Sequence, residues 1–311
     1  MTQDAVLQWL LNADPAIRWQ VMRDLLGEPA ERVAAERARV ATEGWGGRLL
    51  DLQAPDGQWG EGTFTDGWTG TFNTMLLLRE LGPDPASERV RRAIALVRDH
   101  VTWEEEWGNS PFFEGEVEPC INGRVLALGG YFGEVSEALL ERLLSEQLDE
   151  GGWNCEAPPS KRASFNTTIC VLEGLLAYET AKGPRADVTE ARLRGQEYLL
   201  ERRLFRSRST GAVIDPDWTR FSFPTRWHYD VLWGLDYLRR AGVAPASERH
   251  EPRIAEAIDL VAGKRGADGR WVLENPHRGA VHFEMEDGAG KPSRWITLRA
   301  MRVLAWAAAQ G

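Results

Sequence analysis

The sequence predicts an all-α fold, an (α/α)6 toroid of alternating inner and outer helices in a single domain over residues 1–311. Three observations lead to this prediction. Apolar residues recur at helical spacing along almost the whole chain. No segment shows sustained alternation of apolar and polar residues with β-branched enrichment, so a sheet is absent or marginal. Short and long connections alternate between the helical segments, which is typical of a repeat of helical hairpins.

Helix start and stop signals place the elements in order. Asp14 and Pro15 form an N-cap followed by proline at the first helical position. Gly27, Gly82 and Gly242 stand where C-terminal caps are expected. The predicted helices are 3–12, 15–27, 29–43, 67–81, 85–100, 118–132, 134–149, 165–181, 187–205, 223–241, 248–264 and 292–309.

The polarity of the helices sorts them into two layers. Segments such as 71–81 and 169–178 are apolar nearly all round and belong to an inner layer. Segments such as 85–100 and 187–205 carry a polar face and belong outside. The last helix is apolar, so we expect the N-terminal hairpin to cover it and close the ring. An open solenoid, the alternative, would need polar terminal repeats.

A short motif recurs before three of the long connections. Its spacing is Gln-x3-Gly-x-Trp, and its period is roughly 47 residues once the aromatic pair Trp103 and Trp107 is included. The third copy has arginine in place of glutamine. The copies are Gln53/Gly57/Trp59, Gln147/Gly151/Trp153 and Arg265/Gly269/Trp271.

This motif resembles the repeat of the squalene cyclase and protein prenyltransferase superfamily, in particular its small squalene-cyclase-like members. The resemblance covers essentially the whole chain and implies the toroid, with a small, largely hydrophobic ligand in a central cavity; isoprenoids are among the candidates. It also implies that Trp59, Trp153 and Trp271 are structural, each tying the end of an outer helix to its neighbour.

The chain lacks the catalytic motifs that are typical of the superfamily. The Asp-x-Asp-Asp motif of triterpene cyclases, whose central acid is protonated, has its nearest match in Asp215-Pro216-Asp217-Trp218, where Trp218 replaces the last aspartate. No Asp-x-Cys zinc motif of the prenyltransferases occurs. The resemblance therefore implies an architecture without a transferable active site.

Composition narrows the classes of partner. The net charge is −10, which is the wrong sign for neutralising phosphates, so we expect no nucleic-acid partner. The N-terminus has no signal-peptide pattern, no apolar run is long enough to span a membrane, and three cysteines cannot make a closed disulfide framework. We expect a cytoplasmic protein with a small-molecule ligand; the sequence does not identify a protein partner.

The candidate catalytic residues are His228, Asp230 and Asp217. The long connections bring acidic and aromatic residues, with His277 and His282, to one end of the predicted ring. There His228 and Asp230 could form a general acid/base pair. We do not expect direct contact, because residues i and i+2 do not face each other on a helix. A histidine with a purely structural role is the alternative.

Equivalent positions of the repeat and nearby tryptophans supply the candidate ligand-binding residues. For the asparagines the alternative is helix capping, in which they satisfy free N–H groups. The ligand-binding candidates are Trp68, Asn73, Asn122, Arg124, Asn166, Trp227 and Trp295.

We expect neither a metal site nor a cofactor. Zinc is an alternative, with Cys120, Cys155, His228 and Asp230 as ligand-competent residues near one rim. His282, Glu284 and Glu286 form a second, weaker pattern. On the last helix, Arg294, Arg299 and Arg302 are expected either to meet an anionic head group or to pair with acids of the N-terminal hairpin.

Three functions remain open at this point. The first is a lyase or isomerase that acts on the hydrophobic ligand. The second is a non-catalytic ligand-binding or scaffold toroid. The third is an (α/α)6 carbohydrate-active enzyme, for which tryptophan platforms and paired loop acids are suitable.

Overall fold

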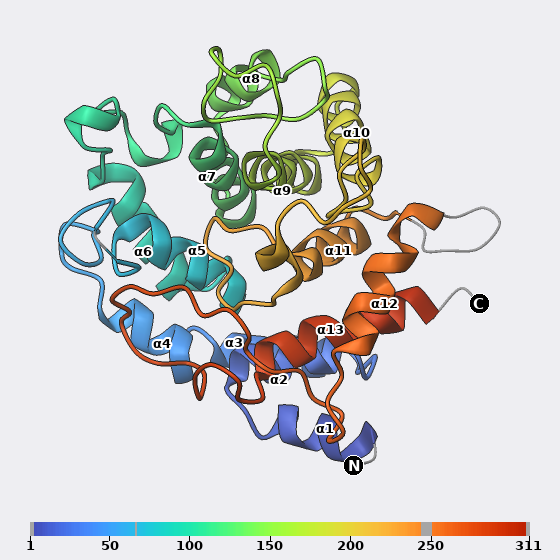
Figure 1. Cartoon of the computed structure of the whole chain (residues 1–311). Coiled ribbons are helices and arrows are strands. Elements are labelled where there is room, and N and C mark those ends of the chain that lie inside the picture. The colour runs from blue at the N-terminus through green and yellow to red at the C-terminus, as the bar shows by residue number, and fades with distance from the viewer. Residues whose placement is uncertain (1–2, 66, 244–250, 309–311) are drawn as a thin grey trace. The chain divides into compact units, whose positions relative to one another are not determined.

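A computed structural model describes residues 3–65, 67–243 and 251–308. Every regular element in these ranges is a helix, as Figure 1 shows. The described residues contain no strand; the pairs Thr102–Pro111, Arg206–Val213 and Val272–Pro292 form isolated bridges. The prediction of an all-α fold is confirmed. None of the described helices is long and apolar enough to cross a lipid bilayer.

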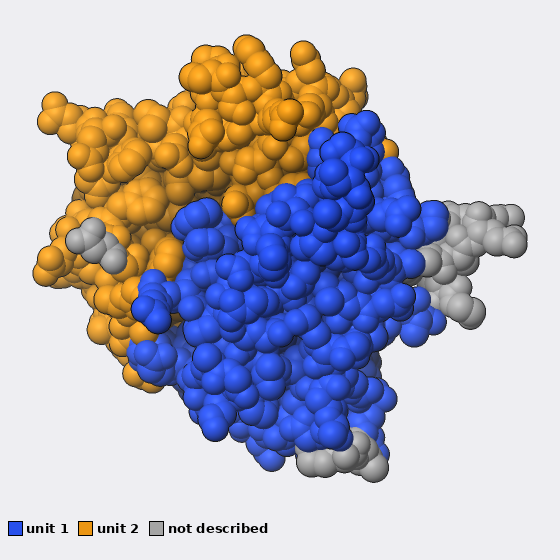
Figure 2. All heavy atoms as spheres, viewed as in Figure 1, with its two compact units in different colours: residues 1–45, 199–278, 283–311 blue, residues 46–198, 279–282 orange. Residues whose placement is uncertain are grey.

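The chain divides into two compact units, coloured separately in Figure 2. Unit 1 comprises residues 1–45, 199–278 and 283–311, and unit 2 comprises 46–198 and 279–282. The single domain over 1–311 stays a prediction.

Unit 1 is built around the two ends of the chain and the segment after residue 199. Its C-terminal helix packs against three others, α2, α11 and α12. The helices are α1 (Gln3–Leu11), α2 (Pro15–Asp24), α3 (Ala30–Arg39), α11 (Val231–Arg240), α12 (Ala255–Gly263) and α13 (Arg294–Ala308), with short 3-10 turns at Pro216–Thr219 and Pro252–Ile254.

Unit 2 is built around a close pair of long helices, α7 and α9. A Cβ on Gly123 would lie 2.5 Å from the Cα of Val171, and one on Gly174 would lie 2.4 Å from the carbonyl oxygen of Gly123. Only glycine allows this approach of the two backbones. The helices of this unit are α5 (Thr71–Leu81), α6 (Glu88–His100), α7 (Pro119–Phe132), α8 (Glu137–Ser145) and α9 (Phe165–Lys182); α4 (Gly44–Asp51) and α10 (Ala186–Leu200) cross the unit boundaries in sequence.

Several helix boundaries differ from the prediction. The helix α4 was not predicted, because its Gly-Trp-Gly-Gly start reads as a breaker. The helix predicted over 223–241 begins only at Val231, since Pro224 disfavours helix at the residue before it and Arg226 has a φ of 57°. The helix predicted over 248–264 begins at Ala255, and its residues 248–250 lie outside the described ranges.

The three Gly-x-Trp turns share one geometry. Each glycine has a φ between 80° and 91°, which favours glycine. Each buried indole donates to the carbonyl oxygen ten residues earlier at 2.7 Å, at the end of the preceding helix. Each tryptophan backbone N–H also donates to a threonine hydroxyl on the following helix, at 3.0 to 3.1 Å. The sets are Leu49/Trp59/Thr71, Leu143/Trp153/Thr168 and Val261/Trp271/Thr297. The structural role expected for the tryptophans is confirmed.

The first residue of the motif makes different hydrogen bonds in the two glutamine copies and in the arginine copy. Gln53 donates to Gly57 within the turn at 3.0 Å and to Ala93 on α6 at 2.9 Å. Gln147 repeats this with Gly151 and, on α10, Ala191. Arg265 keeps the turn bond, to Gly269 at 3.4 Å, and lies over the Trp271 ring. The glutamines therefore join successive outer helices within unit 2.

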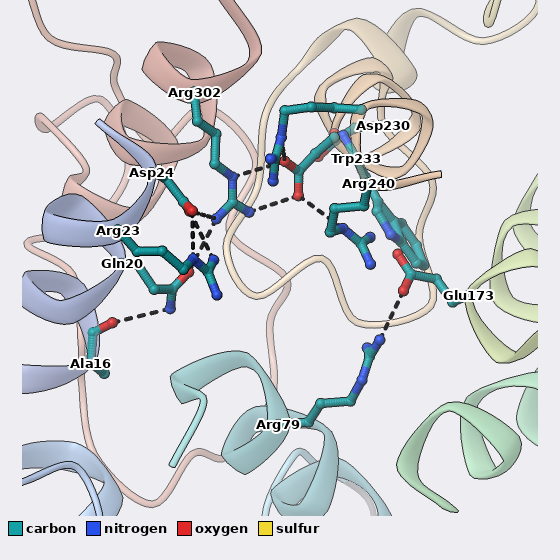
Figure 3. Close-up of polar contacts among 12 residues, drawn as sticks. Ala16, Gln20, Arg23, Asp24, Arg79, Glu173, Asp230, Trp233, Arg240 and Arg302 are labelled. Carbon is teal, nitrogen blue, oxygen red and sulfur yellow. Dashed lines mark hydrogen bonds and ion pairs between the residues drawn. The ribbon is translucent and has the colours of Figure 1, made fainter. Parts of the chain in front are cut away.

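A buried ion network connects α2, α11 and α13 of unit 1. Arg302 of α13 donates to Asp236 of α11 at 2.7 and 2.8 Å, and to Gln20 and Asp24 of α2 at 3.1 and 3.4 Å (Figure 3). Burial opposes the charge of Asp236, but Arg302, Arg239 and Arg240 hold its pKa well below the usual range. The predicted pairing of Arg302 with an acid of the N-terminal hairpin is confirmed.

Candidate functional site

The segment before α11 holds the candidate catalytic residues of unit 1. Asp230 is buried and is the N-cap of this helix, where its Oδ1 accepts from the backbone N–H of Trp233 at 2.8 Å. Its Oδ2 accepts from the backbone N–H and the hydroxyl of Ser222, both at 3.2 Å. One carboxylate therefore fixes both the helix start and the loop that precedes it.

Ser222 connects this carboxylate to a histidine. The Nε2 of His277 lies 3.2 Å from the Ser222 hydroxyl oxygen. Because that hydroxyl donates its one proton to Asp230, its oxygen accepts from the Nε2–H of His277. This order places the imidazole proton on Nε2 and leaves the Nδ1 lone pair as a base.

His228 stacks on the same imidazole. The ring centroids of His228 and His277 are 4.0 Å apart with an interplanar angle of 14°, and those of Trp227 and His228 are 3.7 Å apart. Trp227 is 50% exposed, so the stack of three rings ends at the surface of unit 1. His228 and Asp230 are thus linked through His277 and Ser222, and neither lies on a helix as the sequence suggested.

Burial sets the protonation of these groups. It lowers the pKa of His277 to about 4, with His228 and Arg226 acting in the same direction. It also lowers the pKa of His228, against the attraction of Asp217. Burial raises the pKa of Asp230 to about 6, although its hydrogen bonds and Arg299 oppose this. Near neutral pH the two imidazoles are therefore uncharged, and Asp230 beside them is a carboxylate.

Aromatic and cationic side chains lie next to this segment. Phe223 follows Ser222 directly and stacks on Trp295 of α13, with ring centroids 4.4 Å apart and an interplanar angle of 11°. The ring centroid of Trp45 lies 6.2 Å from that of Trp295. The guanidinium of Arg299 lies 5.0 Å from the Phe223 ring centroid. The indole Nε1 of Trp295 is buried without a hydrogen-bond partner among the described residues. The predicted ligand residue Trp295 thus belongs to a packed aromatic group.

Asp217 lies apart from the buried carboxyl. It belongs to the 3-10 turn Pro216–Thr219, is largely exposed and pairs with Arg220 at 3.0 Å. Its influence on the two histidines is electrostatic, since its negative charge opposes the lowering of the pKa of both His228 and His277 that burial causes. The four residues from Asp215 to Trp218 therefore supply a surface carboxylate.

The candidate asparagines lie in unit 2, where none of them is an N-cap. Gly70 and Ser164 occupy the cap positions of the helices that carry Asn73 and Asn166. Asn122 accepts from the backbone N–H of Glu116 at 2.7 Å and donates to its carbonyl oxygen at 2.9 Å. The side chain of Asn122 is thereby satisfied within the fold.

The other two ligand candidates of unit 2 also contact protein atoms. The Trp68 indole covers Gly279, where a Cβ would lie 2.5 Å from its Nε1, and the Trp68 backbone N–H donates to Ala280 at 2.8 Å. The guanidinium of Arg124 lies beside the buried Cys170 thiol and opposes the rise in its pKa that burial causes.

Two of the predicted zinc ligands come together in unit 2. One sulfur or oxygen atom from each of Glu118, Cys120 and Cys155 lies within 4.8 Å of the others. His228 and Asp230 belong to unit 1. The hydrogen bond from Cys120 lowers the pKa of the Cys155 thiol, and this contact and burial raise the pKa of Cys120. The sequence alone did not identify Glu118 as the third member.

An open hollow of about 500 Å³ lies elsewhere in unit 1. Its carboxylates are already paired, Glu256 with Arg206 and Glu201 with Arg208 at 2.7 Å. It therefore offers a polar surface with neutralised acids. The lining residues are Glu201, Arg203, Arg206, Ser207, Arg208, Gly211 and Glu256.

Sequence reasoning did not connect Ser222 and His277 with Asp230. His277 stood among residues of a long connection, and Ser222 was not singled out. The available signal was Pro224, which favours an extended backbone before it and argues against a helix over 223–230. A loop at this place lets Asp230 act as the cap and turn back toward Ser222.

No protein-family model matches the sequence, and no curated protein matches it. In structure the chain is similar to the type II terpene cyclase MstE from Scytonema. A variant of that enzyme with merosterolic acid A, its product, is 18% identical, with 96% of this chain and 88% of that chain covered and a TM-score of 0.48. A variant with geranylgeranyl dihydroxybenzoate, its substrate, is 18% identical, with coverage of 94% and 86% and a TM-score of 0.47. The apo enzyme is 18% identical, with coverage of 98% and 99% and a TM-score of 0.45.

Proposed function

We propose that the protein is a lyase or isomerase that moves a proton on a small, largely hydrophobic molecule, with isoprenoids as the first class to test. The observation that carries the proposal is the hydrogen-bonded series from Asp230 through Ser222 to His277. His277 is the base, and its Nδ1 takes a proton from a carbon next to an electron-poor centre. Return of that proton to another carbon gives an isomer, and loss of a leaving group gives a lyase product.

Asp230 and Ser222 are positioning residues in this proposal. They keep the Nε2 of His277 protonated, so that the base is always the other nitrogen. His228 stacks on the imidazole and restricts its rotation. General base catalysis of this kind contributes about 100- to 10,000-fold to a rate.

The class of ligand follows from the neighbouring side chains. Trp227 presents a half-exposed ring at the end of the histidine stack, whereas Phe223 and Trp295 are buried against each other in unit 1. Aromatic faces attract positive charge that develops on a hydrocarbon. We place the protein in the cytoplasm, where the free thiols of Cys120, Cys155 and Cys170 stay reduced.

A non-catalytic binding protein is the second candidate, and one observation favours it. Asp230 caps α11 and fixes its loop, so a structural role explains all its hydrogen bonds. A carbohydrate-active enzyme has less support, since the surface acid Asp217 is paired with Arg220.

Deuterium exchange tests the proposed proton transfer without knowledge of the product. The full chain is incubated in D2O with geranial, farnesal or geranylgeranial, isoprenoid aldehydes whose conjugated carbonyl supplies the electron-poor centre, and the recovered lipid is analysed by mass spectrometry. We expect deuterium in at least one of these molecules, and a loss of about 100-fold or more in its rate with His277→Ala.

His100→Ala is the matched control, since this histidine lies exposed on α6 in unit 2. Equal exchange by the wild type and His277→Ala would contradict the role of His277. Binding of a lipid, seen by quenching of tryptophan fluorescence, without any exchange would favour the binding protein. Neither binding nor exchange would remove the isoprenoid class.

A further inference from the structure

A group of two thiols and one carboxylate lies in unit 2, outside the site described above. Glu118 is the N-cap residue of α7, Cys120 is the second residue of this helix, and Cys155 lies in the segment between α8 and α9. Their ligand atoms lie within 4.8 Å of one another, and all three residues are partly exposed. An ion from solution can therefore reach them.

The fold holds these side chains before any ion arrives. The backbone N–H of Glu118 donates to the buried carboxylate of Glu116 at 2.8 Å, and Asn122 fixes the backbone of that residue. The Cys155 sulfur lies 3.4 Å from the hydroxyl of Thr167, in the first turn of α9. Since α7 and α9 pack closely through Gly123 and Gly174, the helix that carries Cys120 has a fixed spacing from the helix whose Thr167 contacts Cys155.

The donor atoms match the preferences of zinc. Thiolate sulfur and carboxylate oxygen are both common ligands of this ion, and two sulfurs bound at about 2.3 Å in a tetrahedron lie roughly 3.8 Å apart. That separation fits within the 4.8 Å limit of the group. The Cys120 sulfur already lies 3.4 Å from the Glu118 carboxylate, so small side-chain rotations complete the set.

We propose that Glu118, Cys120 and Cys155 bind one zinc ion with a fourth position open to water or another ligand. Binding replaces the two thiol protons, so that one Zn²⁺ enters and two protons leave. The two thiolates and the carboxylate, which would repel one another as free anions at this distance, form with Zn²⁺ a complex of net charge −1.

Cys170 provides the matched control. It is a fully buried thiol of α9 and stands outside the group of ligand atoms. Cys155→Ser and Cys170→Ser therefore make the same chemical change, one inside and one outside the proposed site.

The experiment uses the full chain, reduced and stripped of metal by a chelator under anaerobic conditions. Zinc is returned in competition with a chromophoric chelator, and bound metal is counted by elemental analysis and native mass spectrometry. We expect one zinc per chain in the wild type and in Cys170→Ser. We expect a loss of affinity of about 100-fold or more in Cys155→Ser and of at least about 10-fold in Glu118→Gln.

Two further measurements keep the result independent of folding and of enzyme activity. Circular dichroism checks that each variant is folded, and zinc should raise the melting temperature of the wild type and Cys170→Ser but not of Cys155→Ser. Cobalt in place of zinc should give the absorption of a tetrahedral thiolate site. Equal zinc affinity of wild type and Cys155→Ser, or a wild-type stoichiometry far below one, would overturn the proposal. A Cys120–Cys155 disulfide whose reduction restores no zinc binding would overturn it as well.

Discussion

The three Gly-x-Trp turns and the single segment from Phe221 to Asp230 use hydrogen bonds in different ways. In each turn the indole, the backbone N–H and the following threonine repeat the same bonds at nearly the same distances. In the single segment the bonds of Asp230 and Ser222 have no counterpart in the turns, and they end on a histidine. The difference teaches that the repeated bonds tie helices to their connections, whereas the bonds of the single segment also hold a histidine beside a carboxyl group.

The largest effect expected from this comparison is on stability at a repeated tryptophan. Trp153→Ala removes a fully buried indole and its bond to Leu143, and should destabilise the fold by about 3–5 kcal/mol. Trp227→Ala removes a ring that is 50% exposed and should destabilise it by less than about 1 kcal/mol. Urea unfolding measures both.

Trp153→Phe covers the case in which Trp153→Ala does not fold. It keeps an aromatic ring and loses the indole hydrogen bond, so we expect an intermediate destabilisation of about 1–3 kcal/mol. If Trp227→Ala destabilises the chain as much as either change at Trp153, the division between a structural repeat and a functional segment is wrong.

A smaller difference in stability is expected between substitutions in a glutamine copy and in the arginine copy of the motif. Gln147→Ala removes the bonds to Gly151 and, on α10, to Ala191, and should cost about 1–3 kcal/mol of unfolding free energy. Arg265→Ala removes the longer turn bond and a partly exposed cation–π contact, and should cost less than about 1 kcal/mol. Chemical denaturation of the two variants side by side makes the comparison, and the reverse order of costs would show that the bridge between outer helices is unimportant.

The smallest effect concerns the pH dependence of stability. The pKa of His277 is lowered to about 4 from a usual value near 6.5, so its contribution is present above pH 6.5 and is lost as the pH falls toward 4. The pKa of Asp230 is raised to about 6, so its contribution is present at low pH and is lost as the pH rises through 6. The two slopes oppose each other between pH 4 and 6.

His277→Gln removes the part of the pH dependence of stability that comes from His277. The stability of the wild type minus that of the variant should therefore increase from pH 4 to pH 6.5, by less than about 1 kcal/mol because His277 is partly exposed. Thermal or urea unfolding at several pH values measures this difference. A difference that is constant over the window would show that the imidazole titrates alike in the folded and unfolded chain.

The sequence was sufficient for the helical class and the repeated turns, because helical periodicity and the Gly-x-Trp spacing are local signals. It was insufficient for α4, because the glycines at its start have low helix propensity. It was also insufficient for the start of α11, because Pro224 prevents the apolar segment before Val231 from forming a helix. His228 and Asp230 were chosen from their proximity in sequence. Their connection through Ser222 and His277 depends on a contact 55 positions apart, which no local pattern reveals.

The layout of unit 1 has a consequence for biosynthesis. Its core is made from three separate stretches of sequence, and the bond between Gln20 and Arg302 joins positions 282 residues apart. Because translation is vectorial, the first two helices leave the ribosome long before α13 exists to cover them. Unit 2 is almost continuous in sequence, so its own contacts can form earlier during synthesis. The face of α2 that contacts α13 therefore stays uncovered until α13 has been synthesised.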